Sequence, residues 1–110
     1  MKLPNCEDAH IPREKVTDYL LSETHPVGRA KARVLREMGF GESSINDLLS
    51  GLLKIAHSEE VVEVVSSSYG IKYVVEGDLQ SPEGARIRLR TVWIVDAGEH
   101  RPRFVTAYPA

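Results

Sequence analysis

The chain has 110 residues, of which 42% are hydrophobic and 27% are charged, and its formal net charge is −2. This balance excludes a disordered chain, and the length predicts a single domain, residues 1–110, rather than two. The slightly acidic charge excludes nucleic-acid binding through global charge, so such binding would need a locally basic surface.

The location of the protein is suggested by its cysteine usage and its apolar segments. A single cysteine, Cys6, excludes an intramolecular disulfide and fits a reducing cytoplasm. No apolar run is long enough to span a bilayer, and residues 1–8 lack the apolar core of a secretory signal. We therefore expect a cytoplasmic protein without a membrane partner.

The first half of the chain has helical periodicity. Apolar residues spaced by three or four predict helices at 12–21, 29–38 and 44–57. Pro26 and Gly28 interrupt the first two helices, Gly39 ends the second, and Ser44 is suited to begin the third. Gly51 weakens the third helix without excluding it.

The second half alternates between apolar and polar residues, which predicts strands at 60–66, 70–79, 85–96 and 102–108. The connections between them have hairpin length, and no helical crossover is present to support a parallel sheet. The expected fold class is therefore α+β, with N-terminal helices packed on a C-terminal four-stranded antiparallel meander.

The alternation also predicts the faces and the pairing of the two central strands. The expected apolar face has the pairs Val75–Leu89, Tyr73–Thr91 and Ile71–Trp93. The expected charged face has Glu76 beside Arg88, Asp78 beside Arg86, and Lys72 near Arg90 across Val74. Leu89, Ile87 and Trp93 then face the helices, while Arg86, Arg88 and Arg90 face solvent or a ligand, with Arg90 and Lys72 as the free cations.

His25 is the first candidate for chemistry, because it lies in a loop directly before a helix with a basic first turn. Histidine exchanges protons near neutral pH, and a helix N-terminus with Arg29 and Lys31 nearby favours a phosphate. The alternative is structural: His25 caps the helix or binds backbone groups, and the basic residues form a solvated helix face.

The second candidate is the series Arg86, Arg88 and Arg90, whose period of two directs all three to one face of the sheet. Guanidinium groups bind phosphates in a bidentate manner, and Thr106 adds a hydroxyl from the last strand. The alternative is a surface ladder of ion pairs with acidic side chains. Four scattered histidines do not predict a metal site, and no motif predicts a cofactor.

Several motifs resemble a family of small bacterial proteins without an assigned function, and the resemblance covers essentially the whole chain. The motifs are His25-Pro26-x-Gly28-Arg29-x-Lys31-Ala32, Arg90-Thr91-Val92-Trp93-Ile94 and Val105-Thr106-Ala107-Tyr108-Pro109. The resemblance implies no function by itself.

The arrangement of helices followed by an antiparallel sheet also resembles the barnase–EndoU–colicin–RelE (BECR) nuclease superfamily. Toxin branches of that superfamily carry a histidine in the helical part, a basic residue in a central strand and a Thr/Tyr-Pro ending. The resemblance implies these roles for His25, Arg90 and Thr106, with Lys72 as a second basic residue. It implies metal-independent RNA cleavage, in which a base takes the 2′-hydroxyl proton and cations stabilise the phosphorane.

These features are consistent with three functions. The first is a ribonuclease-like toxin domain acting on RNA phosphodiesters. The second is a non-catalytic interaction module that binds a cognate protein, such as an antitoxin, immunity or accessory protein, which the acidic composition and the neutralised arginines favour. The third is a binder of a small ligand on the sheet. The first requires His25, Arg90 and Thr106 to converge on one phosphate.

Overall fold

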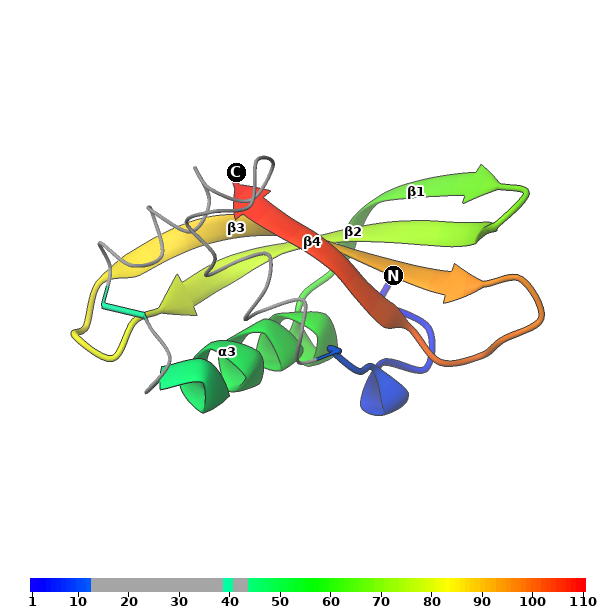
Figure 1. Cartoon of the computed structure of the whole chain (residues 1–110). Coiled ribbons are helices and arrows are strands. Elements are labelled where there is room, and N and C mark those ends of the chain that lie inside the picture. Colours follow the sequence, from blue (N-terminus) through cyan, green and yellow to red (C-terminus); the bar gives the residue numbers. More distant parts are fainter. Residues whose placement is uncertain (13–38, 41–43) are drawn as a thin grey trace, which may run out of the picture.

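The computed structural model describes residues 1–12, 39–40 and 44–110, and within them one long helix lies against an antiparallel sheet (Figure 1). The sheet has four strands in the order β1-β2-β3-β4, which confirms the α+β class and the meander. The helices expected at 12–21 and 29–38 fall, apart from residue 12, outside the described residues. A short 3₁₀ helix, η1 (Cys6–Asp8), is not predicted from the sequence, because three residues show no helical repeat.

Helix α3 (Ile45–Ser58) agrees within one residue with the helix expected at 44–57. Its buried side chains form one stripe: Ile45, Leu48, Leu52, Ile55 and Ala56. Ser44 occupies the N-cap position, although its side chain makes no capping hydrogen bond. Gly51 faces β2, where a Cβ atom would collide with Cδ1 of Leu79, so glycine allows the helix to approach the sheet closely.

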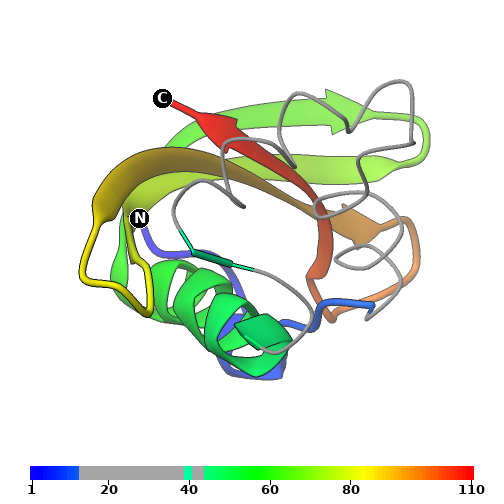
Figure 2. The ribbon, with the colours of Figure 1, turned by 60° about the vertical axis from the view of Figure 1, so that its left-hand side comes forward.

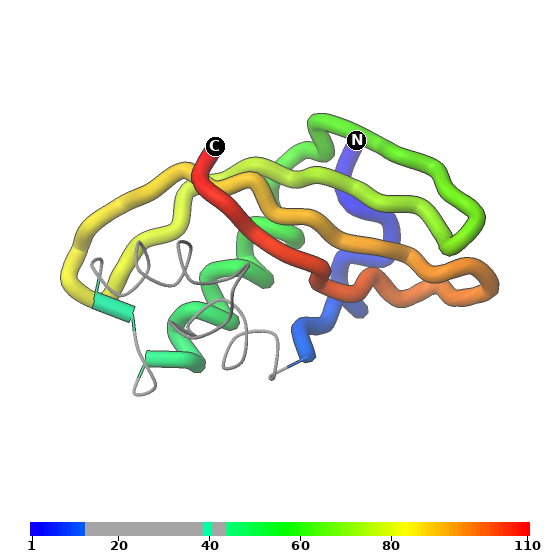
Figure 3. The backbone as a smooth tube through the Cα atoms, turned by 45° about the horizontal axis from the view of Figure 1, so that its top comes forward, coloured from blue at the N-terminus to red at the C-terminus, as the bar shows by residue number. Residues whose placement is uncertain are grey.

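All four expected strands are confirmed within one residue at each end. They are β1 (Val61–Ser67), β2 (Gly70–Gln80), β3 (Arg86–Asp96) and β4 (Arg103–Pro109). The long strands β2 and β3 arch over α3, which lies beneath their inner face (Figure 2). Figure 3 shows the N-terminus close to the start of β1, where the Val61 N–H donates to the Met1 carbonyl.

The expected pairing of β2 with β3 is wrong by two residues. Val75 lies opposite Thr91 rather than Leu89, Tyr73 opposite Trp93 rather than Thr91, and Ile71 opposite Val95 rather than Trp93. On the other face, the backbone partners are Glu76–Arg90 and Asp78–Arg88, whereas Gln80 lies opposite Arg86. Because the error is an even number of residues, every side chain remains on its expected face.

The turn between β2 and β3 explains the two-residue difference. The Ser81 N–H donates to the Ala85 carbonyl over 2.7 Å, and the Ala85 N–H returns to Oγ of Ser81 over 2.9 Å. Gly84 adopts a φ of +88°, which glycine accepts without strain. The turn is therefore centred at residue 83 rather than at residue 82, as the expected pairs imply, and moving the centre of a hairpin by one residue changes its register by two.

The two faces of the central strands are those predicted. Leu89 and Trp93 are buried and Ile87 is half-buried, on the side of the sheet that packs with α3. Arg86 and Arg88 are exposed and Arg90 is half-buried, on the opposite side. We call this opposite side the outer face. It is not wholly polar, since Val74 and Ile94 are also buried there.

The centre of the core is Trp93, which is fully buried and contacts Phe104 edge-to-face with 5.3 Å between ring centroids. Its indole N–H donates to Oγ1 of Thr91 over 2.8 Å, and this hydroxyl donates to the Val75 carbonyl over 2.7 Å. The one polar group of the tryptophan is therefore satisfied inside the core, as burial requires. None of the helices among the described residues is long and apolar enough to cross a membrane.

This buried link between Thr91 and Trp93 gives a stability prediction. Thr91→Val keeps the shape of the side chain but removes the acceptor for the indole N–H, so we expect a loss of about 1–3 kcal/mol in the free energy of unfolding. Chemical denaturation measures it. The same substitution in a Trp93→Phe background should cost clearly less, because phenylalanine has no N–H to leave unpaired. Equal costs in the two backgrounds would contradict the explanation.

Candidate functional site

The register of the sheet brings candidate residues from three strands together on the outer face. One row across the sheet contains Glu76, Arg90 and Tyr108, which are neighbours on β2, β3 and β4. In the next row, Thr106 lies opposite Val92. Arg90 and Thr106 are thus diagonal neighbours on adjacent strands, a relation in which residues are about 7–8 Å apart. We call Arg90, Thr106, Tyr108, Glu76 and Glu63 the Arg90 cluster.

Arg90 is the centre of this cluster and it is not the free cation expected from the sequence. Its Nη1 donates to Oε2 of Glu76 over 2.7 Å, and its Nη2 donates to Oε1 of Glu63 over 3.0 Å. A hydrogen bond to Tyr108 raises the pKa of the guanidinium further above its ordinary value, and the charges of Tyr108, Glu76 and Glu63 act in the same direction. The group is therefore permanently charged and held in place on three sides.

Arg88 pairs with Asp78, the carboxylate that was expected to pair with Arg86. Its Nη1 lies 3.5 Å from Oδ1 of Asp78, and its Nε lies 3.9 Å from Oε1 of Glu76. The expected closeness of Glu76 and Arg88 is thus present between side chains, although their backbones are not opposite one another. The expected pair Asp78–Arg86 is replaced, because the two-residue change in register puts Arg88 opposite Asp78.

Lys72 shares the outer face but not the Arg90 cluster. It lies opposite Ile94 on β3, and Arg90 is four residues further along that strand, a separation of about 13 Å at 3.3 Å per residue. The expectation that Lys72 approaches Arg90 across Val74 is therefore wrong, since Val74 lies opposite Val92. Among the residues that the structure describes, Lys72 has no ion pair.

Three residues of the expected site, His25, Arg29 and Lys31, lie outside the described residues. The structure therefore brings Arg90 and Thr106 together and separates Lys72 from them. Glu63 is a member of the cluster that the sequence does not predict, because it lies on β1, whose pairing with β2 is not evident from alternation. The sequence does contain an indication of this contact, because Glu63 is an isolated acidic residue among valines and is stabilised by a cation on a neighbouring strand.

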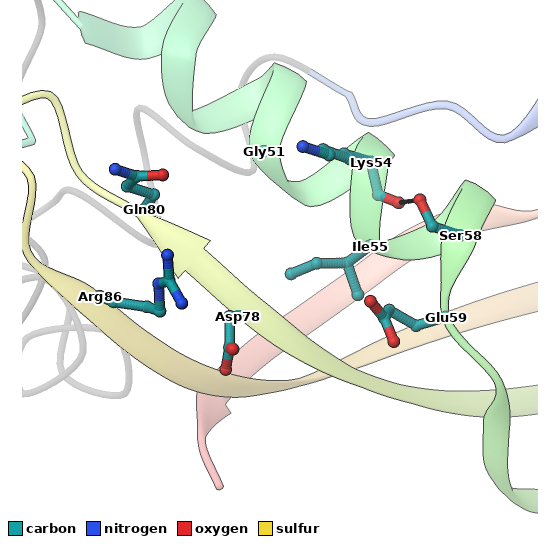
Figure 4. A pocket seen from close by; sticks show the side chains of 8 residues that line it. All are labelled: Gly51, Lys54, Ile55, Ser58, Glu59, Asp78, Gln80 and Arg86. Carbon is teal, nitrogen blue, oxygen red and sulfur yellow. Dashed lines mark hydrogen bonds between the residues drawn. The ribbon is translucent and has the colours of Figure 1, made fainter.

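A separate pocket of about 310 Å³ lies between α3 and the end of the β2–β3 hairpin (Figure 4). Its lining residues are Gly51, Lys54, Ile55, Ser58, Glu59, Asp78, Gln80 and Arg86. Two cations and two carboxylates share the walls, so the pocket offers no excess charge to a phosphate. It contains no member of the Arg90 cluster. Within the described residues, no group of three histidine, cysteine or acidic side chains is placed to hold a metal ion.

The far end of the hairpin β3–β4 is closed by a bidentate ion pair. Nε and Nη2 of Arg103 lie 3.2 Å and 3.1 Å from the two carboxylate oxygens of Asp96. Hydrogen bonds from Arg103, and then the charges of Arg103 and His10, hold the pKa of Asp96 below its ordinary value. Because the native state favours the ionised carboxylate, Asp96 stabilises the fold above about pH 4 and loses this effect as the pH falls.

We therefore expect Asp96→Asn to make stability less sensitive to acid. Between about pH 5 and pH 2, the decrease in the free energy of unfolding should be shallower in this variant than in the wild type. Urea denaturation at several pH values measures the slope. Asp47→Asn, which removes an exposed carboxylate from α3, is the control and should keep the wild-type slope. Parallel slopes for Asp96→Asn and the wild type would contradict the assignment.

The fold has a counterpart among solved structures. It resembles a chain from the structure described as a contact-dependent growth inhibition toxin–immunity protein complex from Klebsiella pneumoniae 342, with a TM-score of 0.76. The match covers 94% of this chain and 95% of that chain, at 18% sequence identity. At this identity the likeness concerns the fold.

Sequence comparison agrees with the resemblance to a family without an assigned function. No curated protein matches the chain. The family model described as a domain of unknown function, DUF6883, matches residues 2–110, which is nearly the whole length. The chain therefore belongs to the DUF6883 family.

Proposed function

We propose that the chain is the toxin of a toxin–immunity pair and that it cleaves RNA without a metal ion. The observation that carries the proposal is the Arg90 cluster, in which a cation and the hydroxyl side chains of Thr106 and Tyr108 lie together on the outer face. Two likenesses support it. The fold resembles a chain of a toxin–immunity complex along nearly its whole length. The order of helices and strands, with a few residue positions, resembles the BECR nucleases.

The chemistry assigns one task to each side chain. His25 takes the proton of a ribose 2′-hydroxyl, and the 2′ oxygen attacks the adjacent phosphorus. The bond from phosphorus to the 5′ oxygen breaks, the 5′ oxygen takes a proton from water, and a 2′,3′-cyclic phosphate remains. His25 then returns its proton to the solvent. Arg90 binds two oxygens of the phosphorane, where negative charge accumulates, and Thr106 donates a hydrogen bond to it.

The carboxylates around Arg90 differ in how firmly they compete with a phosphate. The side chain of Glu63 is 53% exposed, so its ion pair with Arg90 is weak and a phosphate can replace it. Glu76 is only 21% exposed and lies closer, at 2.7 Å, so it keeps the guanidinium oriented. A guanidinium has five N–H donors, which is enough for Glu76 and a phosphate together.

The immunity role is the second candidate, and a specific observation favours it. Three carboxylates, those of Glu63, Glu76 and Asp78, surround the two cations Arg88 and Arg90. Both arginines are therefore neutralised by carboxylates, which suits contact with a protein partner better than the binding of RNA. The second proposal then predicts a protein that inhibits cleavage rather than one that performs it.

Cytoplasmic expression in bacteria and incubation of the purified protein with total RNA in EDTA distinguish the two roles. For the toxin, we expect growth arrest and RNA fragments that end in a cyclic phosphate, with both effects lost in Arg90→Ala. Arg86→Ala is the matched control, since it removes an arginine from the same strand and face but outside the cluster. Normal growth and intact RNA with the wild-type protein would contradict the toxin role.

A further inference from the structure

Strand β1 leaves one edge of the sheet without a neighbouring strand among the described residues. It pairs with β2 alone and is the first strand in the sheet order. In Figure 1 the tip of the β1–β2 hairpin extends beyond the end of α3, so the helix does not cover it. Among the described residues, the N-terminal segment contacts only the start of β1. There the Val61 N–H donates to the Met1 carbonyl, and Lys2 forms an isolated antiparallel β-bridge with Glu60. The free edge therefore begins at Val62.

This edge exposes several valine side chains, which is unusual for an unpaired edge strand. Val62, Val64 and Val65 are 53%, 49% and 43% exposed, on a strand whose neighbours in the sequence are serines rather than lysines. Natural edge strands are protected by charges or by proline, and this strand has one charge and no proline. The one charge, Glu63, is directed to Arg90 on the outer face. An unprotected row of exposed valines is typical of a strand that pairs with another chain.

We propose that the occupant of this edge is a second copy of the same chain, with the two β1 strands antiparallel and Val64 opposite the partner's Val64. Two four-stranded sheets then join into one continuous sheet across a two-fold axis. For both copies to present the same face, a residue must lie opposite its own counterpart. Placing Glu63 on the axis would put two carboxylates opposite one another, which is unfavourable, whereas Val64 on the axis joins two exposed valines.

Charge complementarity supports this register. With Val64 on the axis, Glu63 lies opposite the partner's Val65, on the outer face of the sheet. Val65 is the backbone neighbour of Lys72, so the partner's Lys72 is next in the same row. Lys72 has no ion pair among the described residues, and each copy thus offers one cation across a valine to one carboxylate of the other. The two backbones are two strand spacings apart, about 10 Å, so this long-range attraction adds to the pair of Glu63 with Arg90 and does not replace it.

The proposal goes beyond RNA cleavage and is tested separately from it. Dimer dissociation is measured by analytical ultracentrifugation of the full chain from about 1 µM to 1 mM, the range of moderate affinities. Val64→Lys should raise the dissociation constant at least about 100-fold, because it removes two buried valines and adds two facing charges. Ala85→Lys adds the same charge in the exposed β2–β3 turn and should leave dimerisation unchanged.

Cysteine trapping tests the register. In a Cys6→Ser background, Val64→Cys should oxidise to a covalent dimer, since residues directly opposite have Cα atoms about 4.5–5.5 Å apart. Ser66→Cys should not, because its counterpart is four residues away along the ladder, about 13 Å. Equal trapping at both positions would overturn the register. A wild-type chain that remains monomeric throughout the concentration range would overturn the proposal and assign the edge to a different protein.

Discussion

Arg90→Ala should lower the rate of RNA cleavage by a factor of about 100 to 1,000, the usual effect of removing one preorganised donor from a developing negative charge. The loss should appear in substrate binding as well, because a guanidinium also binds the phosphate in the ground state. RNA affinity should become less dependent on salt, with a slope smaller by about 1, since one phosphate contact is lost. Cleavage rates and titrations at several salt concentrations measure both effects.

Two further variants separate catalysis by Arg90 from a purely structural role. Glu63→Gln removes the exposed carboxylate from the guanidinium and should strengthen RNA binding, because the phosphate no longer competes with it. If Arg90 served only to hold the sheet together, the same substitution would change stability and leave RNA affinity as it was. Arg86→Ala should keep wild-type cleavage.

His25→Ala should have an equal or larger effect on the rate, about 100- to 10,000-fold, if this residue moves the 2′-hydroxyl proton. Its effect should be confined to turnover, with RNA affinity nearly unchanged, since a neutral imidazole contributes little charge to binding. Thermal melting of the variant provides the control for folding. Wild-type cleavage by His25→Ala would contradict its assigned role, while the result for Arg90→Ala would still test the phosphate site.

Trp93→Ala should lower the free energy of unfolding by about 3–5 kcal/mol. The side chain is fully buried between α3 and the sheet, it packs on Phe104, and its N–H has a partner in Thr91, so truncation leaves a cavity and an unused acceptor. A loss of this size is a large part of the stability of a domain of this length. Chemical denaturation measures the change. All variants are compared at one protein concentration, because dimerisation would make the measured stability depend on concentration.

The matched control is Tyr69→Ala, which truncates an aromatic side chain that is 79% exposed in the turn between β1 and β2. It should cost less than about 0.5 kcal/mol, because solvent already reaches this side chain and no cavity forms. Similar costs for Trp93→Ala and Tyr69→Ala would show that the core is not centred on the tryptophan. Trp93→Phe should lie between them, because the ring and its contact with Phe104 are partly kept.

The sequence by itself determined helix α3, the four strands of the sheet and the face on which each of their side chains lies. Alternation has a period of two, so Leu89 and Arg88 had to point in opposite directions once the strand was recognised. The helical stripe of α3 was equally explicit, because burial of leucines and isoleucines at spacings of three and four has few other solutions. These features depend on local backbone geometry, which is set by residues that are close together in the sequence.

Only the tertiary structure decided which residues meet across strands. The pairing of Glu76 with Arg90 rather than Arg88 depends on the turn at Gly84, and a change of two residues preserves every face, so alternation cannot detect it. Glu63 reaches Arg90 from a strand 27 positions away in the chain. Contacts of this kind follow from packing the whole sheet, because ion pairs between distant residues leave no period in the sequence.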